Sequence, residues 1–145
     1  MTGRRIRSVL LIAAALAGLL FDWQGGMEGE AADMAGPETV TSAEAAKLLK
    51  ESGTNPGIVV LDVRTPEEYQ DGHLEGAVMI DFRSNGFKEE LKTLDREKTY
   101  LVYCRTGRRS GSAISMMEEM GFRKIYHLAE GIKGWKEKGF PTTKE

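Results

Sequence analysis

Strand-like and helix-like segments alternate along this chain from Glu38 onward, and that alternation is the strongest constraint on its fold. Residues 58–61 are apolar at every position, as expected of a strand buried on both faces of a parallel sheet. Residues 65–68 (TPEE) combine a capping box with a proline at the first helical position, which predicts a helix start. Repeated strand, helix and strand predict an α/β fold with a mostly parallel sheet and helices on both faces.

The alternation predicts one domain over residues 38–145, with five strands and five helices. Strands are expected at 38–40, 58–61, 77–80, 101–103 and 124–128. Helices are expected from the capping box at 41–44, from that at 65–68, and over 87–94, 110–120 and 131–138. Glycines are expected to end four of them: Gly53, Gly72, Gly121 and Gly139.

The first 32 residues have the pattern of an export signal. Arg4, Arg5 and Arg7 precede an apolar run at 9–21, which is shorter than the roughly 20 residues that span a bilayer. We expect residues 1–32 to be a signal peptide, or an uncleaved N-terminal anchor, plus a linker, and 33–37 to be a disordered lead-in. The protein is then exported and periplasmic or otherwise extracytoplasmic, and it meets a membrane only if the segment stays uncleaved.

Charge and residue counts exclude several classes of function. The net charge of −2 gives no general attraction to nucleic acid, so no nucleic-acid partner is expected. A single cysteine excludes an internal disulfide and a cysteine-based metal cluster. His73 and His127 lack a metal-ligand spacing and are expected to be ordinary structural or surface histidines. No metal is predicted.

That single cysteine, Cys104, follows an expected strand and begins a short loop rich in arginine and glycine. Nearby positive charge favours the thiolate, which is the reactive form of cysteine. Loop amides and the next helix, expected to begin at about Ser110, can together cradle an anion, and Gly107 permits the tight curl. The pattern predicts Cys104 as a nucleophile for an anionic substrate. The predicted anion-binding loop is Arg105, Thr106, Gly107, Arg108, Arg109 and Ser110.

Other polar residues follow neighbouring strands at the same predicted edge of the sheet, where ligands of parallel sheets bind. Asp62 and Arg64 follow the second strand, and residues 129–131 follow the fifth. We expect Asp62 and Arg64 to support the loop, although a helix-capping and turn role alone would also explain Asp62. Trp135 is expected in the core.

Four motifs in order resemble those of a single-domain rhodanese, the thiosulfate sulfurtransferase-like family. They are residues 62–69 (DVRTPEEY), 72–77 (GHLEGA), 104–110 (CRTGRRS) and 128–131 (LAEG), followed by Trp135, Gly139 and Pro141. The resemblance covers residues 40–142. It has one visible departure, because the family often has two adjacent glycines where this chain has Glu130 and Gly131, and this bears on the shape and charge of the pocket rim.

The resemblance implies a sulfurtransferase. Cys104 would attack the outer sulfur of a small anionic donor such as thiosulfate, carry it as a persulfide, and pass it to a thiol or cyanide-like acceptor. Arg105 and Arg108 would face the donor or lie solvated at the surface, while Arg109 would fix the loop or bind the anion. No metal or organic cofactor is implied.

Two other functions stay open at this point. Phosphatases and arsenate reductases also use a cysteine in a loop closed by arginine. The pattern resembled has five residues between the two, whereas four separate Cys104 from Arg109, and Tyr103 stands where many phosphatases have histidine. The shorter loop favours sulfur transfer. The second alternative is an exported, non-catalytic rhodanese-like binding module.

Overall fold

The computed structural model describes residues 36–53 and 57–145. The predicted export segment at 1–32, and the lead-in up to residue 35, lie outside the described residues. Within the described ranges, no helix is both long and apolar enough to cross a membrane.

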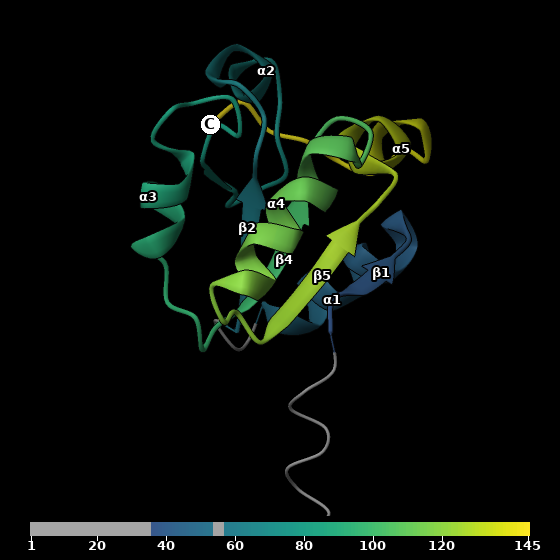
Figure 1. Ribbon diagram of the computed structural model, residues 1–145. Coiled ribbons are helices and arrows are strands. Elements are labelled where there is room, and N and C mark those ends of the chain that lie inside the picture. The colour runs from purple at the N-terminus through teal and green to yellow at the C-terminus, as the bar shows by residue number, and fades with distance from the viewer. Residues whose placement is uncertain (1–35, 54–56) are drawn as a thin grey trace, which may run out of the picture.

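Five parallel strands form one sheet, and helices cover both of its faces (Figure 1). The strand order is β1-β5-β4-β2-β3, which confirms the predicted fold class. The strands are β1 (Glu38–Val40), β2 (Ile58–Asp62), β3 (Val78–Met79), β4 (Thr99–Tyr103) and β5 (Lys124–Leu128). The helices are α1 (Ser42–Ser52), α2 (Pro66–Gln70), α3 (Phe87–Lys92), α4 (Arg108–Glu119) and α5 (Gly131–Glu137).

The helix starts follow local capping chemistry. Thr41 and Thr65 each accept a hydrogen bond from the third helical amide, and both predicted capping boxes are present. The prediction for α4 was wrong by two residues, since the helix begins at Arg108 rather than at about Ser110. Gly107 adopts a left-handed conformation with φ of +94°, which turns the chain early and places two arginines in the first helical turn.

Two apolar cores lie on opposite faces of the sheet, because successive side chains of a strand point to opposite sides. In β4, Tyr100 and Val102 join the core beneath α3 and α4, whereas Leu101 and Tyr103 join the core beneath α1 and α5. Figure 1 shows α4 in front of the sheet and α1 behind it. Trp135 is buried in the second core, as expected.

The C-terminal residues return to the end of α2 and are held there by His73 (Figure 1). The backbones of His73 and Thr143 exchange two hydrogen bonds of 2.8 Å. The buried imidazole stacks on Tyr69, and its nitrogens lie 2.9 Å from the carbonyl oxygens of Tyr69 and Glu145. These contacts give His73 a packing role, in keeping with the expectation for it.

Candidate active site

Cys104 lies directly after β4, the central strand of the sheet, and its side chain is almost completely buried. Two donors point at its sulfur. The amide of Gly107 donates to Sγ over 3.1 Å, and the Ser110 hydroxyl lies 3.4 Å from it. The sulfur therefore sits in a curl of its own loop, at the amino end of α4.

The loop after β4 interlocks with the loop after β5. The amide of Ile132 donates to the Cys104 carbonyl over 2.9 Å, and that of Lys133 to the Arg105 carbonyl over 3.1 Å. A Cβ on Gly107 would lie 2.2 Å from the Ala129 carbonyl oxygen, and one on Gly131 would lie 2.1 Å from that of Arg105. Both glycines also have positive φ, so any side chain there would push the two loops apart.

The surroundings of Cys104 favour its thiolate. Burial raises the pKa of the thiol, but donated hydrogen bonds outweigh burial and hold the pKa below its ordinary value. In order of size, these bonds come from the Ser110 hydroxyl and from the amides of Ser110, Thr106 and Gly107. The Gly107 and Ser110 donors lie at the start of α4, in keeping with the expected effect of the helix start, whereas arginine charge is not among the largest causes.

The guanidinium of Arg109 is paired with the carboxylate of Glu68 in α2, so it is not free to bind an anion. Its guanidinium donates two hydrogen bonds, of 2.7 and 2.8 Å, to the two carboxylate oxygens. The bond from Arg109 is the largest cause that lowers the pKa of Glu68 to about 2. Glu68 is also the capping-box glutamate of α2, so one carboxylate joins the start of that helix to the start of α4. Of the two roles expected for Arg109, the geometry supports fixing the loop.

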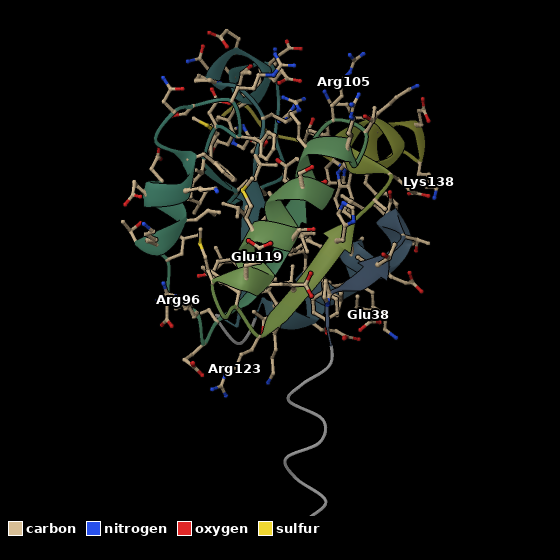
Figure 2. All side chains as sticks on the ribbon, in the orientation of Figure 1. Glu38, Arg96, Arg105, Glu119, Arg123 and Lys138 are labelled. Atoms are coloured by element: carbon tan, nitrogen blue, oxygen red, sulfur yellow. The ribbon has the colours of Figure 1, made fainter. Side chains whose placement is uncertain are left out.

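A pocket of about 350 Å³ is lined in part by Cys104. Arg105 and Arg108 line it and are also exposed, and Arg105 extends beyond the carboxyl-end edge of the sheet in Figure 2. Phe82 and Arg83 line it from the segment after β3, where no motif had singled them out. The complete lining is Phe82, Arg83, Cys104, Arg105, Thr106, Arg108 and Arg109.

Asp62 and Arg64 form a buried cluster behind the loop and do not line this pocket. The Arg64 guanidinium donates to both carboxylate oxygens of Asp62 and to the Gly72 carbonyl. The Tyr103 hydroxyl donates to Asp62 over 2.6 Å and accepts from the Leu74 amide over 3.1 Å. The cluster ties β2 to the last residue of β4, so Asp62 and Arg64 support the strand that carries Cys104.

The Rhodanese-like domain family matches residues 41–138, which include every element from α1 to α5 and the whole cysteine loop.

The chain belongs to the rhodanese-like domain family.

Similar proteins agree with this assignment. The thiosulfate sulfurtransferase PspE of Escherichia coli is 37% identical over 86 residues, which cover 58% of this chain and 77% of that protein. The thiosulfate sulfurtransferase GlpE of Coxiella burnetii is 32% identical over 97 residues, or 67% of this chain and 85% of that protein.

A longer relative and a solved structure are also similar to this chain. The probable adenylyltransferase/sulfurtransferase MoeZ of Mycobacterium tuberculosis is 33% identical over 77% of this chain, which spans only 28% of that protein. A rhodanese-related protein from Thermoplasma volcanium aligns with a TM-score of 0.64 and 29% identity, covering 74% of this chain and 99% of that one.

Glu130, where this rhodanese-like domain departs from the glycine pair, turns away from the pocket. Its carboxylate accepts from the Ser42 hydroxyl over 2.6 Å and from the Ser42 amide over 3.2 Å, and it is paired with Lys138. The bond from Lys138, then those from Ser42, lower the pKa of Glu130 to about 2. Glu130 therefore links the start of α1 to the end of α5 and is not among the residues that line the cysteine pocket.

His127 is the residue near the site that the sequence did not reveal. Its Nε2 lies 2.7 Å from Oγ of Ser110, the same hydroxyl that faces the Cys104 sulfur. No local motif marks a histidine in the middle of a strand, and only the packing of β5 against α4 brings the two together. Among the described residues, no three of the types His, Cys, Asp and Glu gather as candidate metal ligands.

Proposed function

We propose that this rhodanese-like domain is a sulfurtransferase that carries sulfane sulfur as a persulfide on Cys104. The observation that carries the proposal is the thiol itself, whose pKa is lowered by converging hydrogen-bond donors and which lines a pocket together with Arg83, Arg105 and Arg108. Relatives at 32% and 37% identity are named thiosulfate sulfurtransferases, which supports thiosulfate or a similar small anion as the donor.

In the first step, the Cys104 thiolate attacks the outer sulfur of thiosulfate. A new bond forms between Sγ and that sulfur, the donor's sulfur–sulfur bond breaks, and sulfite leaves with the bonding electron pair. The arginines at the pocket mouth suit both the incoming and the departing dianion. The loop amides remain available to the negative charge, which now lies on the persulfide.

In the second step, a nucleophilic acceptor such as a thiolate or cyanide attacks the outer persulfide sulfur. The bond to Sγ breaks, and Cys104 leaves as a thiolate with the electron pair. The hydrogen bonds that lower the pKa of Cys104 also make it a better leaving group. Neither step requires a redox cofactor. In each step, one bond forms with the electron pair of the nucleophile and one bond breaks with its pair going to the leaving group.

Mass spectrometry after incubation with thiosulfate tests the proposal. We expect the wild-type protein to gain one sulfur atom on Cys104, cyanide to remove it as thiocyanate, and Cys104→Ser to do neither while remaining folded by circular dichroism. Ser112→Ala is a matched control, since Ser112 is exposed on α4. A wild-type protein that gains no sulfur, or a Cys104→Ser protein that still transfers it, would contradict the mechanism.

The phosphatase or arsenate reductase alternative has weaker support. Only four residues separate Cys104 from Arg109, which makes a narrow curl, and both carboxylate oxygens of Glu68 occupy the Arg109 guanidinium. We expect no release of phosphate from an aryl phosphate ester under conditions in which the persulfide forms.

A further inference from the structure

The Ser110 hydroxyl has one proton and three neighbours that could take it. Its Oγ lies 3.4 Å from the Cys104 sulfur, 3.1 Å from the Gly107 carbonyl oxygen and 2.7 Å from Nε2 of His127. Ser110 is completely buried, so water does not supply alternative partners. Where this proton goes decides whether the hydroxyl stabilises the thiolate.

The tautomer of His127 controls the outcome. If Nε2 lacks a proton, it is an acceptor at the shortest of the three distances, and the hydroxyl proton turns toward it and away from the sulfur. If Nε2 carries a proton, it donates to a lone pair of Oγ, and the hydroxyl proton is left for the sulfur or the Gly107 carbonyl. A thiolate, being charged, is the stronger acceptor of those two.

The surroundings favour the second arrangement. Burial lowers the pKa of His127, against a smaller opposing effect of the Gly107 carbonyl, so the ring is neutral at neutral pH and has one N–H. The Gly107 carbonyl already accepts from the Gly111 amide over 3.0 Å, so it does not depend on the Ser110 proton. If that proton lies on the Cys104 sulfur, the 2.7 Å contact between Oγ and Nε2 needs a proton from the ring, which a neutral ring with Nε2–H supplies.

We propose that His127 is a positioning residue for sulfur transfer: its Nε2–H donates to Ser110, which directs the hydroxyl proton of Ser110 onto the sulfur of Cys104. This proposal rests on the proposed sulfurtransferase function and assigns the residue that sets the nucleophile. The thiolate attacks in the first step and leaves in the second, so the same three residues, His127, Ser110 and Cys104, would assist both.

The rate of alkylation of Cys104 against pH tests this arrangement without any sulfur donor. We expect His127→Leu to raise the midpoint of the profile by about 0.5–1 pH unit, which is part of the effect of one hydrogen bond to a charged group, because the Ser110 hydroxyl itself remains. His127→Gln, which keeps an N–H donor near the Nε2 position, should restore most of the shift. Tyr126→Phe is the control, because Tyr126 on the same strand packs in the opposite core.

A double-mutant cycle separates this role from a merely structural one. Ser110→Ala should raise the midpoint by itself, and adding His127→Leu to it should raise the midpoint no further. Additive shifts would overturn the proposal, as would an unchanged or lowered midpoint in His127→Leu, since a lowered one would mean that His127 accepts the Ser110 proton.

Nitrogen NMR of the wild-type protein keeps the proposal testable if a variant fails to fold. We expect the neutral His127 ring to carry its proton on Nε2, and a proton on Nδ1 would overturn the inference. With thiosulfate, transfer by His127→Leu near neutral pH should fall by about three- to ten-fold, in proportion to the lost thiolate. A wild-type protein that forms no persulfide would refute the proposed function alone, because the alkylation and NMR results would still stand.

Discussion

At the scale of single residues, the three arginines of the cysteine loop have different roles although the sequence presents them alike. All three line the pocket, but Arg109 is also bound through both of its terminal nitrogens to Glu68. The difference arises from α2, which lies about forty residues earlier and supplies the only carboxylate that these bonds use. The charge at the pocket mouth is therefore smaller than the loop composition indicates, and Arg83 restores part of it.

Glu68→Gln should lower stability at neutral pH by about 1–2 kcal/mol, since the side chain is partly exposed and its ion pair is partly screened. The pKa of Glu68 is lowered to about 2 in the folded protein. The pair therefore stabilises the fold fully above the unfolded pKa of about 4.3 and loses this effect as the pH falls toward 2. Glutamine keeps the capping box, so the change isolates the ion pair.

Urea unfolding of both proteins between pH 7 and pH 2 measures this difference, and Glu67→Gln at an exposed neighbouring position is the control. The difference between wild type and Glu68→Gln should shrink steadily below about pH 4.5. A difference that stays constant down to pH 2 would show that the Glu68 carboxylate contributes no charge-dependent stability.

At the scale of elements, the amino ends of α4 and α5 form one unit around the cysteine loop. Amides at the start of α5 bind the carbonyls of Cys104 and Arg105, while the amide and hydroxyl at the start of α4 face the sulfur. Glu130 directly precedes α5 as its N-cap residue, and its side chain needs room that Gly134 provides one turn later. A Cβ on Gly134 would lie 2.5 Å from the Cβ of Glu130.

Gly134→Ala should therefore destabilise the protein, although alanine is the better helix former by about 1 kcal/mol. In a Glu130→Gly background the crowding is absent, and the same change should stabilise the protein by up to about that amount. Thermal unfolding of the four proteins in this cycle measures the coupling. If Gly134→Ala changed the stability equally in both backgrounds, crowding between its new Cβ and the Glu130 side chain would not contribute to stability.

At the scale of the whole molecule, the parallel topology brings the site together. The strand order places β4 between β5 and β2, so the ends of all three strands reach one edge of the sheet. Cys104 follows the middle strand, His127 comes from one neighbour and the Asp62 cluster from the other. The described residues form one folded unit that begins near Glu38, after a lead of more than thirty residues.

We propose that this lead exports the protein, because Arg4, Arg5 and Arg7 precede an apolar run at 9–21. Positive charge beside an apolar segment holds that end in the cytoplasm while the rest crosses the membrane. Fractionation of cells that express the full chain, with N-terminal sequencing, is the measurement. A new N-terminus near Ala32 indicates a cleaved signal, an intact chain in membranes indicates an anchor, and intact protein confined to the cytoplasm would refute both.

The sequence alone determined the type and order of the elements, and with them the fold class, because these depend mainly on residues within a few positions of one another, although the start of α4 was wrong by two residues. The capping boxes at Thr41 and Thr65 and the apolar run of β2 lie within single turns or strands, and both boxes and the strand are present. The cysteine loop could be predicted from Cys104 and Gly107 for the same reason, since these residues lie only three positions apart in the sequence.

Only the tertiary structure decided how distant side chains pair. Arg109 meets Glu68, Ser110 meets His127, and Glu130 turns toward Ser42, and these partners are 41, 17 and 88 positions apart in the sequence. A lone histidine or glutamate has the same sequence signature whether it faces solvent, a helix start or a reactive sulfur. Its partner is chosen by the packing of β5 against α4 and of α2 beside them, and that packing depends on the whole apolar core rather than on neighbours along the chain.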